Sequence, residues 1–301
     1  MKTELIKTIV CPTCASGFKI RIKRARKNEI EEGQLICTKC GEKFKISSGI
    51  PRFVIDSTKD FVRTEMAFSA KWKNHHKNHY AADWIKFQRR WFLDRFDWNS
   101  FKEFNNFLKS KKQILDAGTG IGNSAKMLAV NPSSTIYALD ASDSIDFAYK
   151  KYGNIKNIHF IQADIRQLPF KKSFFDYIFS DQVLHHTKNT ATSFRYLTKF
   201  LAKAGHVSIY VYNKKAPIRE YVDDFIRKKT VKMSVEECTE FSKDMAFLGK
   251  SLSKLKKKIT SLRSDLNNNI SVLEVWALKN VLDEKAVQIA DLSKLVGEVK
   301  N

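Results

Sequence analysis

Three glycines at alternate positions follow a short hydrophobic stretch that ends in an acid. The stretch reads "QILDAGTGIGN" over residues 113–123, with the acid at Asp116 and the glycines at Gly118, Gly120 and Gly122. Glycines in such a turn let a ligand approach the backbone closely. A dinucleotide site would place a glycine at position 123, where this chain has Asn123. Because Asp116 would repel a pyrophosphate and attract an ammonium group, the pattern favours a ligand without phosphates.

Two further acids follow hydrophobic stretches downstream. Asp140 ends the strand predicted in "STIYALDAS", about 20 residues after the glycines, and Asp164 comes just past a strand predicted over 158–162. A carboxylate at the first place can accept hydrogen bonds from both hydroxyls of a ribose, and one at the second from an adenine amino group. The three acids therefore predict a binding site for an adenosine derivative that carries an ammonium group.

The elements that position these acids alternate between strand and helix. Strands are predicted over 113–116, at 134–142, over 158–162 and 175–180, and over 205–212, with helical patterns at 143–152 and 190–203. This alternation indicates an α/β fold with a doubly wound, mostly parallel sheet that binds its ligands at the carboxyl ends of the strands. All the marked acids lie at those ends.

The segments "LDAGTGIGNS", "LDAS", "QADIRQLPF" and "FDYIFSDQVLHHT" together resemble the motifs of class I S-adenosylmethionine-dependent methyltransferases, over residues 113–212. The resemblance implies a Rossmann-like fold and S-adenosyl-L-methionine as cofactor. Asp116 and the glycines would line the methionine portion, Asp140 the ribose, and Asp164 with Ile165 the adenine. The full set of implied cofactor-binding residues is Asp116, Ala117, Gly118, Gly120, Gly122, Asp140, Ala141, Asp164, Ile165 and Asp181.

Candidates for a catalytic base follow the fourth predicted strand. They are Asp181, His185 and His186 in "SDQVLHHT". A histidine ionises near neutral pH and suits an acceptor that must lose a proton. The alternative is that both histidines pack or hydrogen-bond beside the cofactor.

Two C-x2-C pairs lie in the first fifty residues. Cys11 with Cys14 and Cys37 with Cys40 can place four thiolates in a tetrahedron, the closed geometry of structural zinc. Apolar and polar residues alternate between the pairs, as in the two arms of a hairpin, so a zinc ribbon is predicted without a catalytic role. With "GIPRF" behind it, the segment resembles small zinc-ribbon proteins that activate tRNA and protein methyltransferases, and the whole chain is similar to bacterial methyltransferases that begin with such a ribbon.

The net charge of +22 raises the question of nucleic-acid binding. The basic residues are spread along the whole chain, with the densest run, "KIRIKRARK", at 19–27. A solvated basic face is the commoner outcome of such a distribution.

No apolar stretch is long enough for a signal peptide or a membrane span, which favours a cytoplasmic protein.

The predicted domains are a zinc ribbon at 1–55, a helical, aromatic-rich connector or lid at 56–112, the methyltransferase core at 113–212 and a helical region at 213–301. Aromatic residues at 65–108 could cover the acceptor or simply form core. His75 and His79 could grip a metal but lack an evident third ligand. Leu252, Leu255 and Ile259 recur at helical spacing, which suits a coiled coil that joins subunits or a helix packed on its own domain.

These patterns predict an S-adenosylmethionine-dependent methyltransferase whose acceptor is a small molecule or an intermediate of a glycan pathway. One alternative is an rRNA or tRNA methyltransferase that docks RNA through "RIKRARK" in its zinc ribbon. Another is a catalytically inactive cofactor-binding protein that acts as an interaction module through its helical tail. The acceptor atom is not predicted, because this fold serves many substrates.

Overall fold

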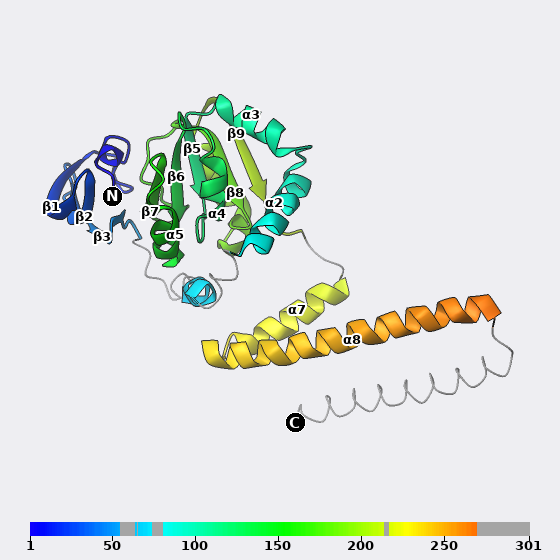
Figure 1. Cartoon of the computed structure of the whole chain (residues 1–301). Helices are drawn as coiled ribbons and strands as arrows, with labels where there is room; N and C mark the ends of the chain where they lie inside the picture. The colour runs from blue at the N-terminus through cyan, green and yellow to red at the C-terminus, as the bar shows by residue number, and fades with distance from the viewer. Residues whose placement is uncertain (55–63, 65, 74–80, 214–216, 270–301) are drawn as a thin grey trace. The chain divides into compact units, whose positions relative to one another are not determined.

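A computed structural model describes residues 1–54, 64, 66–73, 81–213 and 217–269 of the chain. Figure 1 shows the elements in chain order. The chain divides into two compact units, Met1–Glu220 and Tyr221–Asn301. His75 and His79 lie outside the described residues.

The first unit begins with a small antiparallel sheet. Its strands are β1 (Phe18–Arg26), β2 (Glu29–Cys37), β3 (Lys43–Ser47) and β4 (Ile50–Pro51), in the order β1-β2-β3-β4, preceded by the 3-10 helix η1 (Thr3–Lys7). The hairpin predicted between the two cysteine pairs is therefore present as β1 and β2. It holds the two cysteine turns at one end of the small sheet.

The four cysteine side chains converge. Their sulfur atoms all lie within 4.8 Å of one another, with Cys11 3.7 Å from Cys40, and Cys14 3.4 Å from Cys37 and 3.7 Å from Cys40. Four sulfurs at about 2.3 Å from a tetrahedral zinc ion would be separated by about 3.8 Å. The donor set and its spacing therefore fit structural zinc, as predicted for a ribbon fold.

The zinc ribbon packs against the edge of the main sheet. The backbone N–H of Phe53 donates to the carbonyl of Gln162 at 2.7 Å, and the side chain of Arg52 binds the Gln162 amide oxygen at 2.8 Å and Asp146 at 2.7 Å. Near the start of the chain, the Lys2 ammonium donates to the carbonyls of Ile155, Lys156 and Ile158. Ribbon and sheet thus share hydrogen bonds and buried apolar contacts.

The main sheet has five parallel strands in the order β7-β6-β5-β8-β9. Their bounds are β5 (Gln113–Ala117), β6 (Thr135–Asp140), β7 (Ile158–Gln162), β8 (Phe175–Asp181) and β9 (Leu201–Tyr210). The helices α4 (Asn123–Leu128), α5 (Ser144–Tyr152) and α6 (Thr190–Thr198) alternate with them (Figure 1). The predicted doubly wound α/β fold is confirmed.

Two predicted boundaries are wrong. The helix expected over 190–203 ends at Thr198, and β9 begins at Leu201 instead of 205. β9 is irregular near its start, because Leu201 pairs with Phe175 while His206 pairs with Tyr177, and Ala204 has a φ of 60°. This local departure from regular pairing hides the strand's beginning from a sequence pattern.

Successive residues of each central strand enter different cores, as a pleated strand requires. In β5, Ile114 belongs to the core beneath α3 (Phe101–Lys109), α4 and α5, while Leu115 belongs to the core shared with the ribbon and α6. Both side chains are fully buried. The central strands are therefore covered on both faces, which explains their continuous apolar sequence.

The aromatic segment before β5 forms helices, as predicted. Residues 66–73 are helical, and α2 (Ala82–Phe96) and α3 follow. Phe92 and Phe104 are buried in the core against Phe179 and each other, whereas Phe68, Trp72, Trp84 and Trp91 line a cavity. Part of the segment thus forms core, while its role as a cover over the acceptor stays a prediction.

The second unit contains most of α7 (Pro217–Thr230) and all of α8 (Val235–Asn269). The leucines predicted at helical spacing lie on α8, where Leu252 and Leu255 are exposed. Among the described residues no strand follows β9. None of the described helices has the length and apolar character needed to cross a bilayer.

Replacing Cys40 with Ser removes one of four thiolates. We expect the variant to lose zinc and to lose about 5 kcal/mol or more of unfolding free energy, since structural zinc contributes about 10–16 kcal/mol to folding in isolated zinc fingers. Because the ribbon shares a core with the main sheet, that loss should appear in the thermal unfolding of the first unit. Metal analysis and circular dichroism provide the measurement.

The matched control is Cys238→Ser on α8, which changes the thiol that stands apart from the cluster. It should keep its zinc and its unfolding temperature. Equal zinc content in the Cys40→Ser variant and the unmodified protein would contradict the assignment.

Candidate active site

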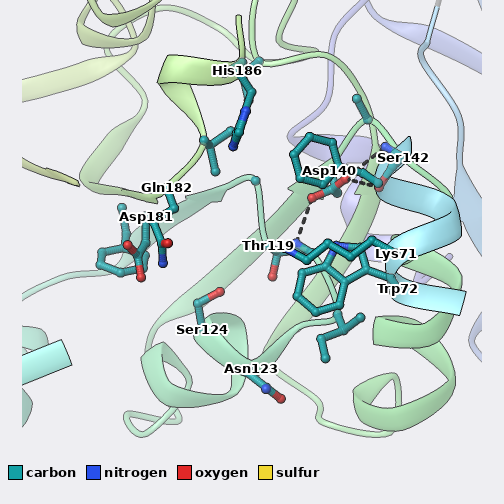
Figure 2. A pocket seen from close by; sticks show the side chains of 18 of the residues that line it. Lys71, Trp72, Thr119, Asn123, Ser124, Asp140, Ser142, Asp181, Gln182 and His186 are labelled. Atoms are coloured by element: carbon teal, nitrogen blue, oxygen red, sulfur yellow. Dashed lines mark hydrogen bonds between the residues drawn. The ribbon is translucent and has the colours of Figure 1, made fainter. Parts of the chain in front are cut away.

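A cavity of about 1000 Å³ opens at the carboxyl ends of the parallel strands. Its wall on the sheet side is formed by the glycine turn after β5, the residues that follow β6 and β7, and the residues around the end of β8. Residues 66–73 and α2 form the wall on the helical side. Figure 2 shows side chains from both walls around one space.

The glycine turn has a backbone that other residues would strain. Gly118, Gly120 and Gly122 all have positive φ angles, of 90°, 55° and 85°. A Cβ on Gly118 would collide with the side chain of Val183, and a Cβ on Gly122 would lie 3.0 Å from Ala148. Gly118 and Gly120 line the cavity, whereas Gly122 packs against α5.

Asp140 fixes the glycine turn to the end of β6. Its Oδ2 accepts from the backbone N–H of Gly120 at 2.8 Å, and its Oδ1 accepts from the N–H and hydroxyl of Ser142 at 2.9 and 2.6 Å (Figure 2). Each carboxylate oxygen can accept two hydrogen bonds, so Oδ2 keeps one free position. Asp140 lines the cavity, and that position suits a ribose hydroxyl.

Asp116 lies behind the glycine turn and not on the cavity wall. The side chain is 1% exposed, and its Oδ2 accepts from the hydroxyl of Ser124 at 2.7 Å. Burial, helped by the nearby charges of Asp140 and Asp181 and opposed by the hydrogen bond from Ser124, raises the pKa of this carboxyl to about 7. Ser124 does line the cavity and lies between Asp116 and that space. Ala117 is buried in the core.

Asp164 is engaged by its own loop. Its carboxylate accepts from the backbone N–H of Arg166 at 2.7 Å. The side-chain Nε of Arg166 also donates to its two oxygens, at 3.0 and 2.9 Å. Asp164 and Ile165 both line the cavity, as does Ala141 after β6. An adenine amino group would thus share Asp164 with an arginine that the sequence analysis did not assign to the site.

Asp181 forms a two-pronged ion pair with Arg95 of α2. Its two oxygens lie 2.9 and 2.8 Å from the two terminal nitrogens of the guanidinium. Burial raises the pKa of Asp181, and Arg95 counteracts the rise. The guanidinium also lies over the ring of Trp91, 3.9 Å from its centre, and 5.0 Å from that of Tyr210. A carboxylate held in this way orients α2 and is a poor proton acceptor.

The two histidines have different surroundings, although their ring centres lie 4.1 Å apart. His186 is exposed, lines the cavity and contacts the ring of Phe68. His185 is not part of the cavity wall. It stacks on Tyr212 with ring centres 4.0 Å apart, both ring nitrogens are buried without a hydrogen-bond partner among the described residues, and burial lowers its pKa. Of the two predicted base candidates, only His186 faces the cavity.

The wall formed by α2 and residues 66–73 contributes side chains that the sequence analysis did not assign to the site. The indole of Trp72 lies against the glycine turn, 3.5 Å from the place a Cβ of Gly120 would take. Trp72 and Trp91 belong to the aromatic segment that was expected to cover the acceptor or form core. Nothing in the local pattern marks the polar residues of this wall, because the wall forms only when the helices pack across the sheet. They are Lys71, Gln88, Arg89 and Arg95.

A family model described as "Methyltransferase domain" matches residues 108–271, which is more than half of the chain. The chain belongs to this family. The resemblance predicted from the sequence is confirmed, and with it S-adenosylmethionine as the cofactor. The match begins in α3 and covers the glycine turn, Asp140 and Asp164.

Two curated relatives match parts of the methyltransferase. A malonyl-[acyl-carrier protein] O-methyltransferase of Legionella pneumophila is 33% identical over 92 residues, which cover 30% of this chain and 32% of that protein. A ubiquinone/menaquinone biosynthesis C-methyltransferase of Coxiella burnetii is 26% identical over 136 residues, which cover 42% of this chain and 54% of that protein. The chain therefore spans about a third to a half of these relatives.

Among solved structures, a methyltransferase described as SAM-dependent, from Aquifex aeolicus, matches with 19% identity and a TM-score of 0.35, over 50% of this chain and 87% of that one.

The residues present fit S-adenosylmethionine. Gly118 and Gly120 bring backbone to the cavity surface, and Asp140 keeps an acceptor position open. Asp116 is a buried acid that no described cation pairs with, and Ser124 is bonded to it at the cavity wall. An ammonium group bound at this wall would be stabilised by the nearby carboxylate.

Replacing Arg95 with Ala leaves the mostly buried Asp181 without its cation. We expect a loss of about 2–3 kcal/mol of unfolding free energy, somewhat less than for a fully buried pair, since Asp181 is 19% exposed. Arg90→Ala changes an exposed arginine of the same helix and should be nearly neutral. Urea denaturation measures both. Similar losses in the two variants would show that the ion pair is not what stabilises α2.

Replacing Asp116 with Asn tests the raised pKa. Between about pH 4 and pH 7 the folded protein retains a proton on Asp116 that the unfolded chain has released, so this group lowers stability as the pH rises through that window. The asparagine has no such dependence. We therefore expect the unfolding free energy of the variant, relative to the unmodified protein, to rise from pH 5 to pH 7.5.

The control for this series is Asp94→Asn, which changes an exposed acid of α2. Its unfolding free energy, relative to the unmodified protein, should change little with pH. A constant difference for Asp116→Asn as well would contradict the raised pKa.

Proposed function

We propose that this protein transfers a methyl group from S-adenosylmethionine to a small-molecule acceptor, including an intermediate of a glycan pathway. The observation that carries the proposal is the two-sided cavity. One wall holds the residues expected to bind the cofactor, and the other is lined with aromatic and cationic side chains. A volume of about 1000 Å³ accommodates a cofactor together with a small acceptor.

The cofactor supplies a methyl group bound to a positively charged sulfur. A lone pair of the acceptor forms a bond to the methyl carbon while the carbon–sulfur bond breaks and its electrons go to sulfur. Much of the acceleration of such a displacement comes from alignment and exclusion of water. Here the glycine turn and Asp140 orient the donor, while α2 and residues 66–73 enclose the space above it.

An acceptor that must lose a proton has His186 as the candidate base. This imidazole lines the cavity, and histidine ionises near neutral pH. Asp181 is bound by both prongs of Arg95, and His185 is turned away against Tyr212, so we assign positioning roles to them. We therefore assign neither Asp181 nor His185 a direct contact with the acceptor.

The parts of the chain take corresponding roles in this proposal. The zinc ribbon at 1–55 supports the edge of the sheet, 56–112 supplies the lid and 113–212 binds the cofactor. The helical region at 213–301 serves association with other chains, and the protein acts in the cytoplasm.

The RNA alternative depends on the basic strand β1. Lys19, Arg21 and Lys23 are exposed there, but Arg24 and Arg26 pair with glutamates of β2, Arg24 at 2.8 Å from Glu31. These pairs reduce the free positive charge of the strand.

The inactive alternative would keep the cofactor site and lack an acceptor.

Replacing Asp140 with Ala tests the cofactor site. The variant loses an acceptor for a ribose hydroxyl and the bond that fixes Gly120. A hydrogen bond to a charged group contributes about 1.5–3 kcal/mol, so we expect affinity for S-adenosylhomocysteine to fall about 10- to 150-fold. Isothermal titration measures it, with Asp94→Ala as the unaffected control. Unchanged affinity in the Asp140→Ala variant would contradict the assignment.

The acceptor class is tested with cofactor labelled in the methyl group. The zinc-loaded protein is incubated with labelled cofactor and either the small-molecule or the RNA fraction of a cell extract, beside the Asp140→Ala variant. Label in the small-molecule fraction that the variant does not produce supports the proposal. Nuclease-sensitive label would favour the RNA alternative, and saturable cofactor binding without any labelled product would favour the inactive one.

A further inference from the structure

The acidic side chains of the cavity wall are already engaged. Asp140 accepts three hydrogen bonds from the backbone and Ser142, Asp164 is held by Arg166, and Asp181 is held by Arg95. These are the three carboxylates among the described residues that line the cavity. Asp164 and Asp181 are thus paired with cations, and Asp140 is committed to the glycine turn and the expected ribose, so we assign none of them to the acceptor.

Three cations of the same wall have no such partner. Lys71, Arg89 and Lys188 line the cavity, and none of them forms an ion pair with a carboxylate among the described residues. Together with Arg95 and Arg166, the wall carries five basic against three acidic side chains, an excess of two positive charges. Arg89 is held in place by packing on the ring of Phe101, at 3.9 Å from the ring centre.

Arg95 adds a buried donor that lacks an acceptor. Its side chain is 7% exposed, and its two terminal nitrogens bind Asp181. The remaining Nε is buried and has no hydrogen-bond partner among the described residues. A buried N–H without an acceptor is costly, so Arg95 carries one donor that its ion pair with Asp181 does not satisfy.

The rest of this wall is aromatic. Trp84 and Trp91 of α2 line the cavity beside Arg89 and Arg95, and Phe92 of the same helix also contributes to the lining. Such rings bind the apolar body of a ligand, while nearby cations select its charge. The wall of α2 thus combines an apolar surface with donors and no free acid.

We propose that the acceptor is an anionic small molecule whose carboxylate or phosphate group is bound by Arg89 and Lys188, with its apolar body against the tryptophans of α2. This inference rests on the proposed function and specifies its substrate class. The positive sulfonium of the cofactor adds to the attraction, and methyl transfer removes that charge. The product complex therefore holds the anion less tightly than the substrate complex does.

The test uses the full, zinc-loaded chain saturated with S-adenosylhomocysteine. Three probes of similar size are titrated by ligand-observed NMR: phenylacetate, phenyl phosphate and the neutral 2-phenylethanol. We expect at least one anion to bind about tenfold tighter than the alcohol, as one or two partly screened ion pairs would provide. The two anions distinguish a carboxylate from a phosphate. Added salt should weaken the binding of the two anions and leave the binding of the alcohol unchanged.

Variants locate the interaction. Arg89→Gln and Lys188→Gln should each reduce anion binding about threefold to fivefold while leaving the alcohol and S-adenosylhomocysteine unaffected. Lys172→Gln changes an exposed lysine of the loop before β8, away from the cavity wall, and should change nothing.

Equal binding of the three probes, or no detectable binding, by protein shown to hold S-adenosylhomocysteine overturns the inference and leaves the proposed function intact. The inference is also overturned if Lys172→Gln weakens the binding of the anions as much as Arg89→Gln does. Failure of the protein to bind S-adenosylhomocysteine overturns the proposed function and the inference with it.

Discussion

The parallel pairing of β5 with β6 is the constraint on which the site depends. Asp116 pairs in register with Ala138, and Ala117 with Leu139, so that the two strands end together. The N–H groups of Gly118 and Thr119 then donate to the carbonyl of Leu139, and Gly120 reaches the Asp140 carboxylate. A register shift of one residue would turn alternate side chains to the other face and separate the turn from the acid that fixes it.

The ribbon contributes to the same arrangement from the outer edge of the sheet. Its last residues pair with β7 at Gln162, two residues before Asp164, and its apolar face joins the core that contains Leu115 and Leu139. Zinc thus stabilises a segment that covers an edge strand and one face of the sheet. A four-cysteine site with no open position has a structural effect on the cavity, through β7, and no direct chemical one.

The helical wall decides what kind of ligand the cavity suits. On α2, Phe92 is buried in the core and also reaches the cavity lining beside Trp91. Arg95 joins this helix to Asp181 at the end of β8. Because that ion pair is mostly buried, the position of α2 is tied to the strand ends. The cations and rings of α2 are therefore presented to the cofactor wall in a fixed arrangement.

The sequence by itself determined the doubly wound sheet, the cofactor and the zinc ligands. Each of these depends on local spacing: strands that alternate with helices, glycines after a strand, and cysteines two residues apart. Only the tertiary structure decided which expected residues face the cavity. It placed His186 there and His185 against Tyr212, and it put Ser124 between Asp116 and the cavity. It also revealed Arg95, Arg89 and Lys71, because contacts between elements far apart in sequence leave no periodic trace in either element.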